Sequence, residues 1–440
     1  MINSLANLWR SLNFMLALQQ GNIPEARRIL KEIKQSGAKL SWQEKLFQDN
    51  LKLERALKEK DQQLREVSQK FAELDLEFTF KKFDELSLEL DSLNTLNLAP
   101  DQKFIEFITQ SFKMIQHDEG MLQCQGIDPR VFDDFESHLV KFIEEELKIY
   151  SRNTRFNELL KEAIDDINNL KGGKEPKYNL ELSPLVYLMR YFLANVYCNY
   201  IAWFLIYKAG LLPTEMKILD IAAGPGTVAY GLALLFQSMS GFFSLPQLDI
   251  SYYSLDQQKA FQYRGLQFWR KYMEPKGVNA YFRFNSSSFF DYDKKSRLIP
   301  KGYFDFIVIS HCFFAESDLR IKSLRVYHEI ITNSLKESGY VLLIIQDKKL
   351  FIPYNIRQSD DVFVERDLVT RFVKDLGLNL VWYQYLTSTG NRKRTENFNQ
   401  FAKENLPVQN KMRHLSSQYL GLKFDLNYSL DDYIILAQLP

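Results

Sequence analysis

Residues 217–232, KILDIAAGPGTVAYGL, constrain the fold more than any other part of the chain. The apolar residues before the glycines predict a buried strand, and the residues after them predict the first turn of a helix. Gly224 and Gly226 flank Pro225, so the backbone can pass close to a ligand where a side chain would fill the space. The free N–H groups at the start of the helix also favour a ligand site, because they can donate hydrogen bonds to an anionic group. This unit predicts a nucleotide-type site at the edge of a parallel sheet.

Further strands and helices alternate after this stretch. We expect strands at residues 250–255, 280–284, 304–310, 340–346, 378–386 and 433–438. Continuous apolar strands separated by helices are typical of a parallel sheet that is covered on both faces. No helix of similar regularity separates the last two strands, so we expect them to form an antiparallel pair at one edge.

The first 175 residues predict an all-α N-terminal domain, and residues 176–440 a second domain, with a linker at residues 171–176. The segment QQGNIPEARRIL is similar to one tetratricopeptide unit, but no second copy follows, which favours an ordinary helical hairpin. Residues 42–74 predict a long charged helix. Residues 73–91 are acidic and form either a solvated face or a docking surface. We expect this domain to contact a substrate or a protein partner.

Residues 183–207 are the most hydrophobic run and are long enough to span a bilayer. Arg190, Asn195 and Asn199 interrupt it, so we expect a buried helix and no membrane span. The formal net charge of +1 does not indicate that the chain as a whole binds nucleic acid. The three cysteines lie far apart without metal-ligand spacing, so we expect no metal site, a reducing compartment and a cytoplasmic protein.

The strand order and the segment ILDIAAGPGT resemble the class I S-adenosylmethionine-dependent methyltransferases. The resemblance covers residues 185–440 and implies an α/β fold with a seven-stranded, mostly parallel, doubly wound sheet. It also implies that S-adenosylmethionine is the cofactor. Asp220 and the small residue Ala222 precede the Gly224-x-Gly226 loop, and the resemblance places Asp220 near the methionine end of the cofactor. Asp256, followed by Gln257, ends the second strand, where its two oxygens can accept both ribose hydroxyls.

The NAD-binding Rossmann domain is the competing nucleotide fold, because Ala229 is acceptable in its G-x-G-x-x-G pattern. The acid before the loop and the closing strand pair favour the methyltransferase. After the third strand the usual acid near the adenine is missing. Adenine contacts are therefore assigned either to Asn285 or Ser286 with Phe289, or to Asp291.

A narrower similarity links YLMRYFLANVYCNYIAWFL and ISHCFFAES to the methyltransferase-like family associated with the small ribosomal subunit. That family's four-cysteine cluster is absent here, and QDKK stands where it has Glu-Pro-Gly.

The fourth strand delivers Ser310, His311 and Cys312 to the edge where ligands bind. Ser310 is expected to line the cofactor. His311 is either the general base for an oxygen or nitrogen acceptor or a structural residue at the strand end. Cys312 lacks the preceding proline of the cytosine C5 methyltransferases, which disfavours covalent attack.

The connection at residues 387–430 is rich in basic residues, including Arg392, Lys393 and Arg394. It is either a solvated loop or a grip for RNA or a protein partner, although no RNA-binding aromatic signature accompanies it. The sequence thus predicts a methyltransferase with an unidentified O or N acceptor. The alternative is a catalytically inactive methyltransferase-fold protein that acts as an assembly scaffold through its helical domain.

Overall fold

The computed structural model describes residues 13–14, 16–17, 23–36, 97–172, 174–246, 248–277, 280–293, 298–357, 360–393, 397–422 and 426–440. The chain divides into two compact units, Met1–Asn94 and Thr95–Pro440. In the first unit, α2 (Ile23–Gln35) presents Ala26, Ile29, Leu30 and Ile33 to a small apolar cluster that also contains Phe14. The predicted charged helix and acidic segment at residues 42–91 lie outside the described residues.

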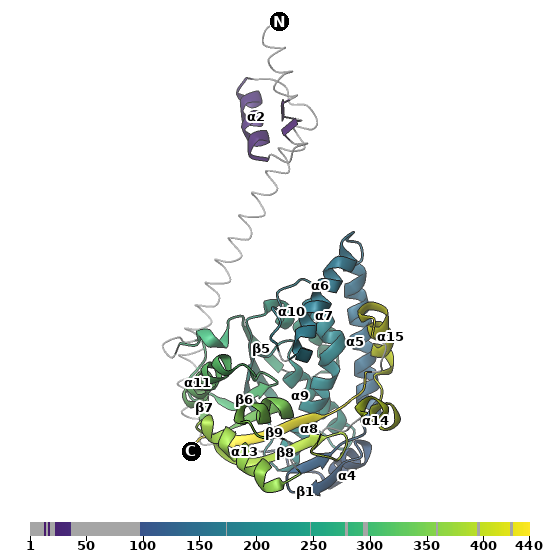
Figure 1. Cartoon of the computed structure of the whole chain (residues 1–440), viewed down its shortest axis with the longest axis vertical. Coiled ribbons are helices and arrows are strands. Elements are labelled where there is room, and N and C mark those ends of the chain that lie inside the picture. Colours follow the sequence, from purple (N-terminus) through teal and green to yellow (C-terminus); the bar gives the residue numbers. More distant parts are fainter. Residues whose placement is uncertain are drawn as a thin grey trace. The chain divides into compact units, whose positions relative to one another are not determined.

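The second unit is built on one nine-stranded sheet with the order β1-β2-β8-β9-β7-β6-β3-β4-β5. Figure 1 shows β8 and β9 side by side in this sheet. The strands are β1 (Ile115–Asp118), β2 (Met121–Gln123), β3 (Glu215–Ile221), β4 (Asp249–Leu255), β5 (Ala280–Asn285), β6 (Phe304–Ser310), β7 (Leu335–Gln346), β8 (Asn379–Thr387) and β9 (Asp431–Gln438).

Strands β3 to β7 pair in parallel, whereas β9 runs antiparallel to both β7 and β8. The predicted antiparallel pairing of the last two strands is therefore confirmed, but their expected position at an edge is wrong, because β2 pairs with the other side of β8. The predicted count of seven strands is wrong, because the β1–β2 hairpin adds two strands, with β2 parallel to β8. This short hairpin has only three or four residues per strand and lacks the long apolar run by which the other strands were found.

Two apolar cores cover the two faces of the sheet, as the alternation of side chains along each strand requires. In β3, for example, Ile218 belongs to one core and Leu219 and Ile221 to the other. The helices of the larger core are α4 (Gln102–Ser111), α5 (Pro129–Tyr150), α6 (Phe156–Asn168), α7 (Ser183–Tyr187), α8 (Leu193–Lys208), α9 (Thr227–Ser240), α10 (Lys259–Tyr272) and α15 (Asn410–Leu420). Those of the smaller core are α11 (Ser317–Ser334), α12 (Asp347–Phe351) and α13 (Val362–Asp375). Helix α14 (Phe398–Asn405) lies in the connection between β8 and β9.

The apolar run at residues 183–207 forms α7, the π-helical turn η2 (Leu188–Phe192) and α8, and most of its side chains are buried, as predicted. Within the described residues, no helix combines the length and apolarity needed to cross a membrane. Helices α8 and α9 approach very closely at Gly231, where an added Cβ would lie 2.7 Å from the Asn199 Cβ. Close approach at a glycine fixes α8 against the helix that follows the glycine loop.

The expected boundary at residue 175 does not separate two compact units. Helices α4, α5 and α6 share the larger core with α8 and α9, so residues 95–175 belong to the unit that contains the sheet. This region also contains β1 and β2 and is therefore not all-α. The expected linker at residues 171–176 continues into a packed segment: Asp166 of α6 accepts hydrogen bonds from the backbone N–H groups of Lys177 and Tyr178 at 2.9 and 3.0 Å.

Candidate functional site

The glycine loop connects the end of β3 to α9 with three left-handed residues. Ala222, Gly224 and Gly226 have φ angles of 58°, 52° and 83°. A Cβ added at Gly224 would meet no atom within 4 Å, so open space borders the loop at this point. Gly226 is the N-cap of α9 and has no side chain to satisfy the first N–H groups of that helix. The loop thus has the open cradle and the helix N-terminus expected of a nucleotide-type site.

Asp256 stands directly after β4 and is held against the glycine loop. One carboxylate oxygen accepts a 2.8 Å hydrogen bond from the Gly224 N–H, and the other accepts one of 2.6 Å from the Gln258 N–H. Burial raises the pKa of Asp256, and the two backbone hydrogen bonds oppose that rise. Each oxygen has a second lone pair, so the carboxylate can still accept two hydroxyl donors.

Asp220 is 1% exposed near the end of β3, and it accepts a hydrogen bond from the Tyr252 hydroxyl on β4. Burial raises its pKa to about 8, although the hydrogen bond from Tyr252 opposes this. The acid before the loop therefore has a partner within the sheet.

The four residues predicted around the adenine and ribose lie after β4 and at or after the end of β5. Gln257 is exposed beside Asp256. The Asn285 side chain accepts a 2.7 Å hydrogen bond from Ser287, and Ser286 donates one of 2.7 Å to Gln262 on α10. Phe289 is buried and stacks on Tyr327 of α11, with ring centroids 4.9 Å apart. These contacts fix the end of β5 against both α10 and α11.

Residues 174–178 form a strap that the sequence did not reveal. The Lys177 carbonyl accepts a 3.4 Å hydrogen bond from Gln258 beside Asp256, and the Tyr178 ring packs edge-on against Phe261 of α10 at 5.6 Å. At its other end Glu175 lies 3.8 Å from Lys349, which follows β7. The strap therefore connects segments that follow β4 and β7, at the carboxyl edge of the sheet.

His311 follows β6 and is positioned by several contacts. Its φ angle is 60°, a left-handed conformation that is uncommon for a residue with a side chain, and its N–H donates a 2.8 Å hydrogen bond to the Ile344 carbonyl. Nδ1 lies 2.9 Å from the Ser310 hydroxyl, and Nε2 lies 3.2 Å from a carboxylate oxygen of Asp432. Ser310 also accepts a 3.2 Å hydrogen bond from Asn199 on α8. Both ring nitrogens thus face side chains of the same chain.

Asp432 and Cys198 adjoin His311 but were not predicted as site residues. Asp432 is the second residue of β9, and because β9 is antiparallel its first residues lie at the edge where the parallel strands end. That geometry is a signal in the sequence, since Asp431 and Asp432 start the last apolar strand. Cys198 lies on α8 and carries no comparable local signal.

Cys312 is not poised as a nucleophile. Its carbonyl accepts a 2.7 Å hydrogen bond from the Tyr327 hydroxyl, and burial raises the pKa of its thiol to about 12. The thiol is therefore protonated at neutral pH, in line with the expectation against covalent attack.

The connection between β8 and β9 does not present Arg392 to a ligand. The Arg392 guanidinium is buried, donates hydrogen bonds to Asp118 at 2.7 and 2.9 Å, and donates to Glu365 at 2.8 and 3.2 Å. Lys393 forms an exposed 2.8 Å ion pair with Asp360, and Arg394 lies outside the described residues. The most conspicuous basic residue of this connection is therefore structural.

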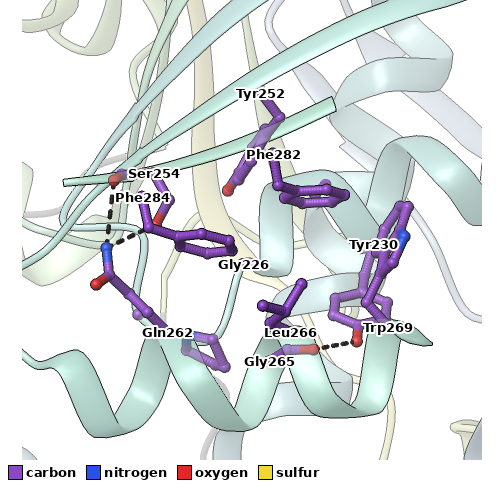
Figure 2. Close-up of a pocket in the computed structure, with 13 residues that line it drawn as sticks. Gly226, Tyr230, Tyr252, Ser254, Gln262, Gly265, Leu266, Trp269, Phe282 and Phe284 are labelled. Carbon is purple, nitrogen blue, oxygen red and sulfur yellow. Dashed lines mark hydrogen bonds between the residues drawn. The ribbon is translucent and has the colours of Figure 1, made fainter. Parts of the chain in front are cut away.

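A small pocket lies under the glycine loop, where α10 approaches β4 and β5 (Figure 2). Aromatic side chains dominate its lining, and Gln262 bonds to Ser254 at one end. Helix α10 comes so close that a Cβ on Gly265 would lie 2.1 Å from the Pro225 carbonyl oxygen. Figure 2 shows the Tyr230 hydroxyl bonded to the Gly265 carbonyl, which closes the other side. The side chains around this pocket hold α10 against the glycine loop.

No protein-family profile and no curated protein sequence matches the chain. Similar solved structures include the YcgJ protein of Bacillus subtilis, at 15% identity over 54% of this chain and 98% of that one, with a TM-score of 0.29. A putative sarcosine dimethylglycine methyltransferase from Galdieria sulphuraria is 15% identical over 55% of this chain and 84% of that one, with a TM-score of 0.30. Geranyl diphosphate methyltransferase, solved with GPP and sinefungin, is 14% identical over 54% of this chain and 76% of that one, with a TM-score of 0.32.

The chain's own topology can be compared directly with the fold expected from its sequence. The glycine loop follows a central strand, the neighbouring strand ends in Asp256, and the antiparallel strand β9 is inserted beside β7. These features are the ones that the resemblance to the class I S-adenosylmethionine-dependent methyltransferases implies for the fold.

Proposed function

We propose that the chain binds S-adenosylmethionine at the glycine loop and transfers its methyl group to an oxygen or nitrogen acceptor. The observation that carries the proposal is the open space at Gly224 beside the carboxylate of Asp256. A backbone cradle next to a carboxylate with free lone pairs suits a ligand that has both a charged chain and a ribose.

Each predicted cofactor residue has a role in this proposal. Gly224 and Gly226 provide the cradle, Ala222 and Asp220 line the end of β3, and Asp256 accepts the ribose hydroxyls. Gln257, Asn285, Ser286 and Phe289 surround the adenine end, and Ser310 lies toward the transferable methyl group. The bound cofactor supplies an electrophilic methyl group, so the protein has mainly to position the acceptor in line with it.

His311 is the residue we assign to the acceptor side. Its Nε2 lies 3.2 Å from the Asp432 carboxylate, which holds the ring in one orientation. In this arrangement His311 removes the acceptor's proton only if the acceptor approaches within hydrogen-bond reach of a ring nitrogen.

Equilibrium dialysis of the full chain with labelled S-adenosylmethionine and S-adenosylhomocysteine tests the binding step. Gly224→Ala adds a Cβ to the open space and should remove binding. Gly277→Ala is the matched control, because Gly277 has a φ of 72° and also has no atom within 4 Å of an added Cβ. Both variants carry similar backbone strain, so equal affinities in the two would refute the site.

A second candidate function is a non-catalytic scaffold. It is favoured by the contacts of His311 and Cys312, whose polar groups are all directed to partners within the chain or buried. Incubating the protein with labelled S-adenosylmethionine and fractionated cell extract separates the candidates. Methyl label that appears in the extract with the wild type but not with Gly224→Ala supports the enzyme. Tight cofactor binding without label in any fraction supports the scaffold.

A further inference from the structure

Three side chains with metal-ligand chemistry converge at the carboxyl edge of the sheet. The Cys198 Sγ, a His311 ring nitrogen and an Asp432 carboxylate oxygen all lie within 4.8 Å of one another. They come from α8, the end of β6 and the start of β9, segments separated by more than 100 residues. A thiolate, an imidazole and a carboxylate are the ligand types that Zn²⁺ accepts.

The contact between His311 and Asp432 has the separation of two ligands on one ion. Nε2 and Oδ1 are 3.2 Å apart, yet Oδ1 accepts no hydrogen bond from any described residue. Two donors at zinc-ligand distances of about 2.0 Å subtend an angle of roughly 106° when they are 3.2 Å apart, close to tetrahedral. A buried carboxylate oxygen without a donor is costly, and a cation between the two side chains removes that cost.

The surroundings of the cluster fit a held ion. Cys198 is 1% exposed and Asp432 is 8% exposed. One thiolate and one carboxylate balance the charge of a divalent cation, so the filled site is neutral in a buried position. The partly exposed His311 ring leaves a side open to solvent.

The remaining nitrogen of His311 has the partner that a zinc-bound histidine needs. Nδ1 lies 2.9 Å from the Ser310 hydroxyl, which is itself fixed by Asn199. A protonated Nδ1 that donates to Ser310 leaves Nε2 with its lone pair for the metal. The left-handed backbone of His311 is strained for a residue with a Cβ, and such strain is characteristic of functional positions.

We propose that Cys198, His311 and Asp432 bind one zinc ion, with its fourth position open to water or an exchangeable ligand. On binding, the Cys198 thiol releases its proton to solvent and its sulfur lone pair bonds to the metal, without any change of oxidation state. Three protein ligands and one open position are the arrangement of catalytic rather than structural zinc sites. With zinc bound, both ring nitrogens of His311 are engaged, so this proposal replaces the general-base role of His311 and leaves cofactor binding at the glycine loop unchanged. Zinc binding is measured without the cofactor, so the two proposals are tested separately.

The first test equilibrates the purified full chain with Zn²⁺, removes free metal by desalting, and measures zinc by elemental analysis. The wild type should retain about one zinc per chain, and Cys198→Ser and Asp432→Asn should bind zinc at least roughly tenfold more weakly in a chelator competition. Cys124→Ser is the matched control, because Cys124 is also buried and free but lies outside the cluster. It should retain zinc like the wild type.

Substitution with Co²⁺ provides a readout that folding defects do not imitate. The wild-type complex should show visible bands of tetrahedral cobalt and a near-ultraviolet thiolate-to-cobalt band. Cys198→Ser should lose the thiolate band, and Cys124→Ser should keep it. Ser310→Ala leaves all three ligands in place and should weaken binding by about 10–100-fold through loss of the Nδ1 partner. Absence of zinc from the wild type, or a thiolate band that persists in Cys198→Ser, would overturn the proposal.

Discussion

The backbone N–H of Gly224 donates a 2.8 Å hydrogen bond to the carboxylate of Asp256, which ties the glycine loop to the end of the neighbouring strand. The same carboxylate caps Gln258 at the start of the segment that leads into α10. One side chain therefore sets the position of both the cradle and the helix beside it.

Asp256→Ala should lower the free energy of unfolding by about 2 kcal/mol, because two backbone N–H groups lose a charged acceptor. Urea denaturation measures this change. Asp256→Asn retains one carbonyl oxygen and should lose roughly half as much. If both variants unfold like the wild type, the carboxylate does not anchor the loop.

Ala222→Gly should stabilise the protein by about 0.5–1 kcal/mol. Ala222 has a φ of 58°, and a left-handed alanine costs about 1–2 kcal/mol, part of which the greater freedom of glycine in the unfolded chain offsets. Thermal and urea unfolding provide the measurement. Ala223→Gly is the neighbouring control. Ala223 is buried and has no positive φ, so the same change there should destabilise the protein.

Asp220 should make the protein less stable as the pH rises. Its pKa is about 8 in the folded chain because of burial, above the ordinary value of 3.8, so between these values the folded state holds a proton that the unfolded state releases. The free energy of unfolding should then fall by up to about 1.4 kcal/mol per pH unit from this group. Urea denaturation at pH 5, 6, 7 and 8 should show a shallower decline in Asp220→Asn. The exposed Asp249→Asn should follow the wild type, and an unchanged slope in Asp220→Asn would contradict the assignment.

Arg392→Met should destabilise the protein by about 3–5 kcal/mol, because Glu365 and Asp118 would lose their shared cation. The hydrogen bond from Arg392 is the main cause that lowers the pKa of Asp118. A lowered pKa stabilises the fold above the unfolded value near 4, and this part is lost as the pH falls below it. Asp118→Asn should therefore flatten the acid limb of the stability curve. The exposed Lys393→Met should change stability by less than about 1 kcal/mol, since an exposed ion pair contributes little.

The central sheet could be predicted because its strands are long apolar runs with clear turns. The 217–232 segment gave the correct strand, loop and helix, and residues 304–310 and 433–438 are within two residues of β6 and β9. The β1–β2 hairpin escaped detection because its strands have only four and three residues, and β2 owes its place to pairing with β8, more than 260 residues away. Local patterns carry no information about such a pairing.

The site was predictable only where it is local in sequence. Asp256 follows its own strand directly, and its position beside Gly224 confirms that the two segments meet. Cys198, His311 and Asp432 come together only when α8, β6 and β9 are in place, so counting cysteines and their spacing could not find them. The sequence left Arg392 open between a solvated loop and a ligand contact, because its partners Glu365 and Asp118 are 27 and 274 residues away.

Strand β9 occupies residues 431–438, and it lies inside the sheet between β7 and β8. Strands β3 to β7 pair with one another without it, but β8 and the β1–β2 hairpin join them only through β9. During synthesis, the sheet therefore cannot close until nearly the whole of this sequence has left the ribosome. Until then β7 and β8 expose unpaired edges, which makes the nascent chain dependent on protection against aggregation.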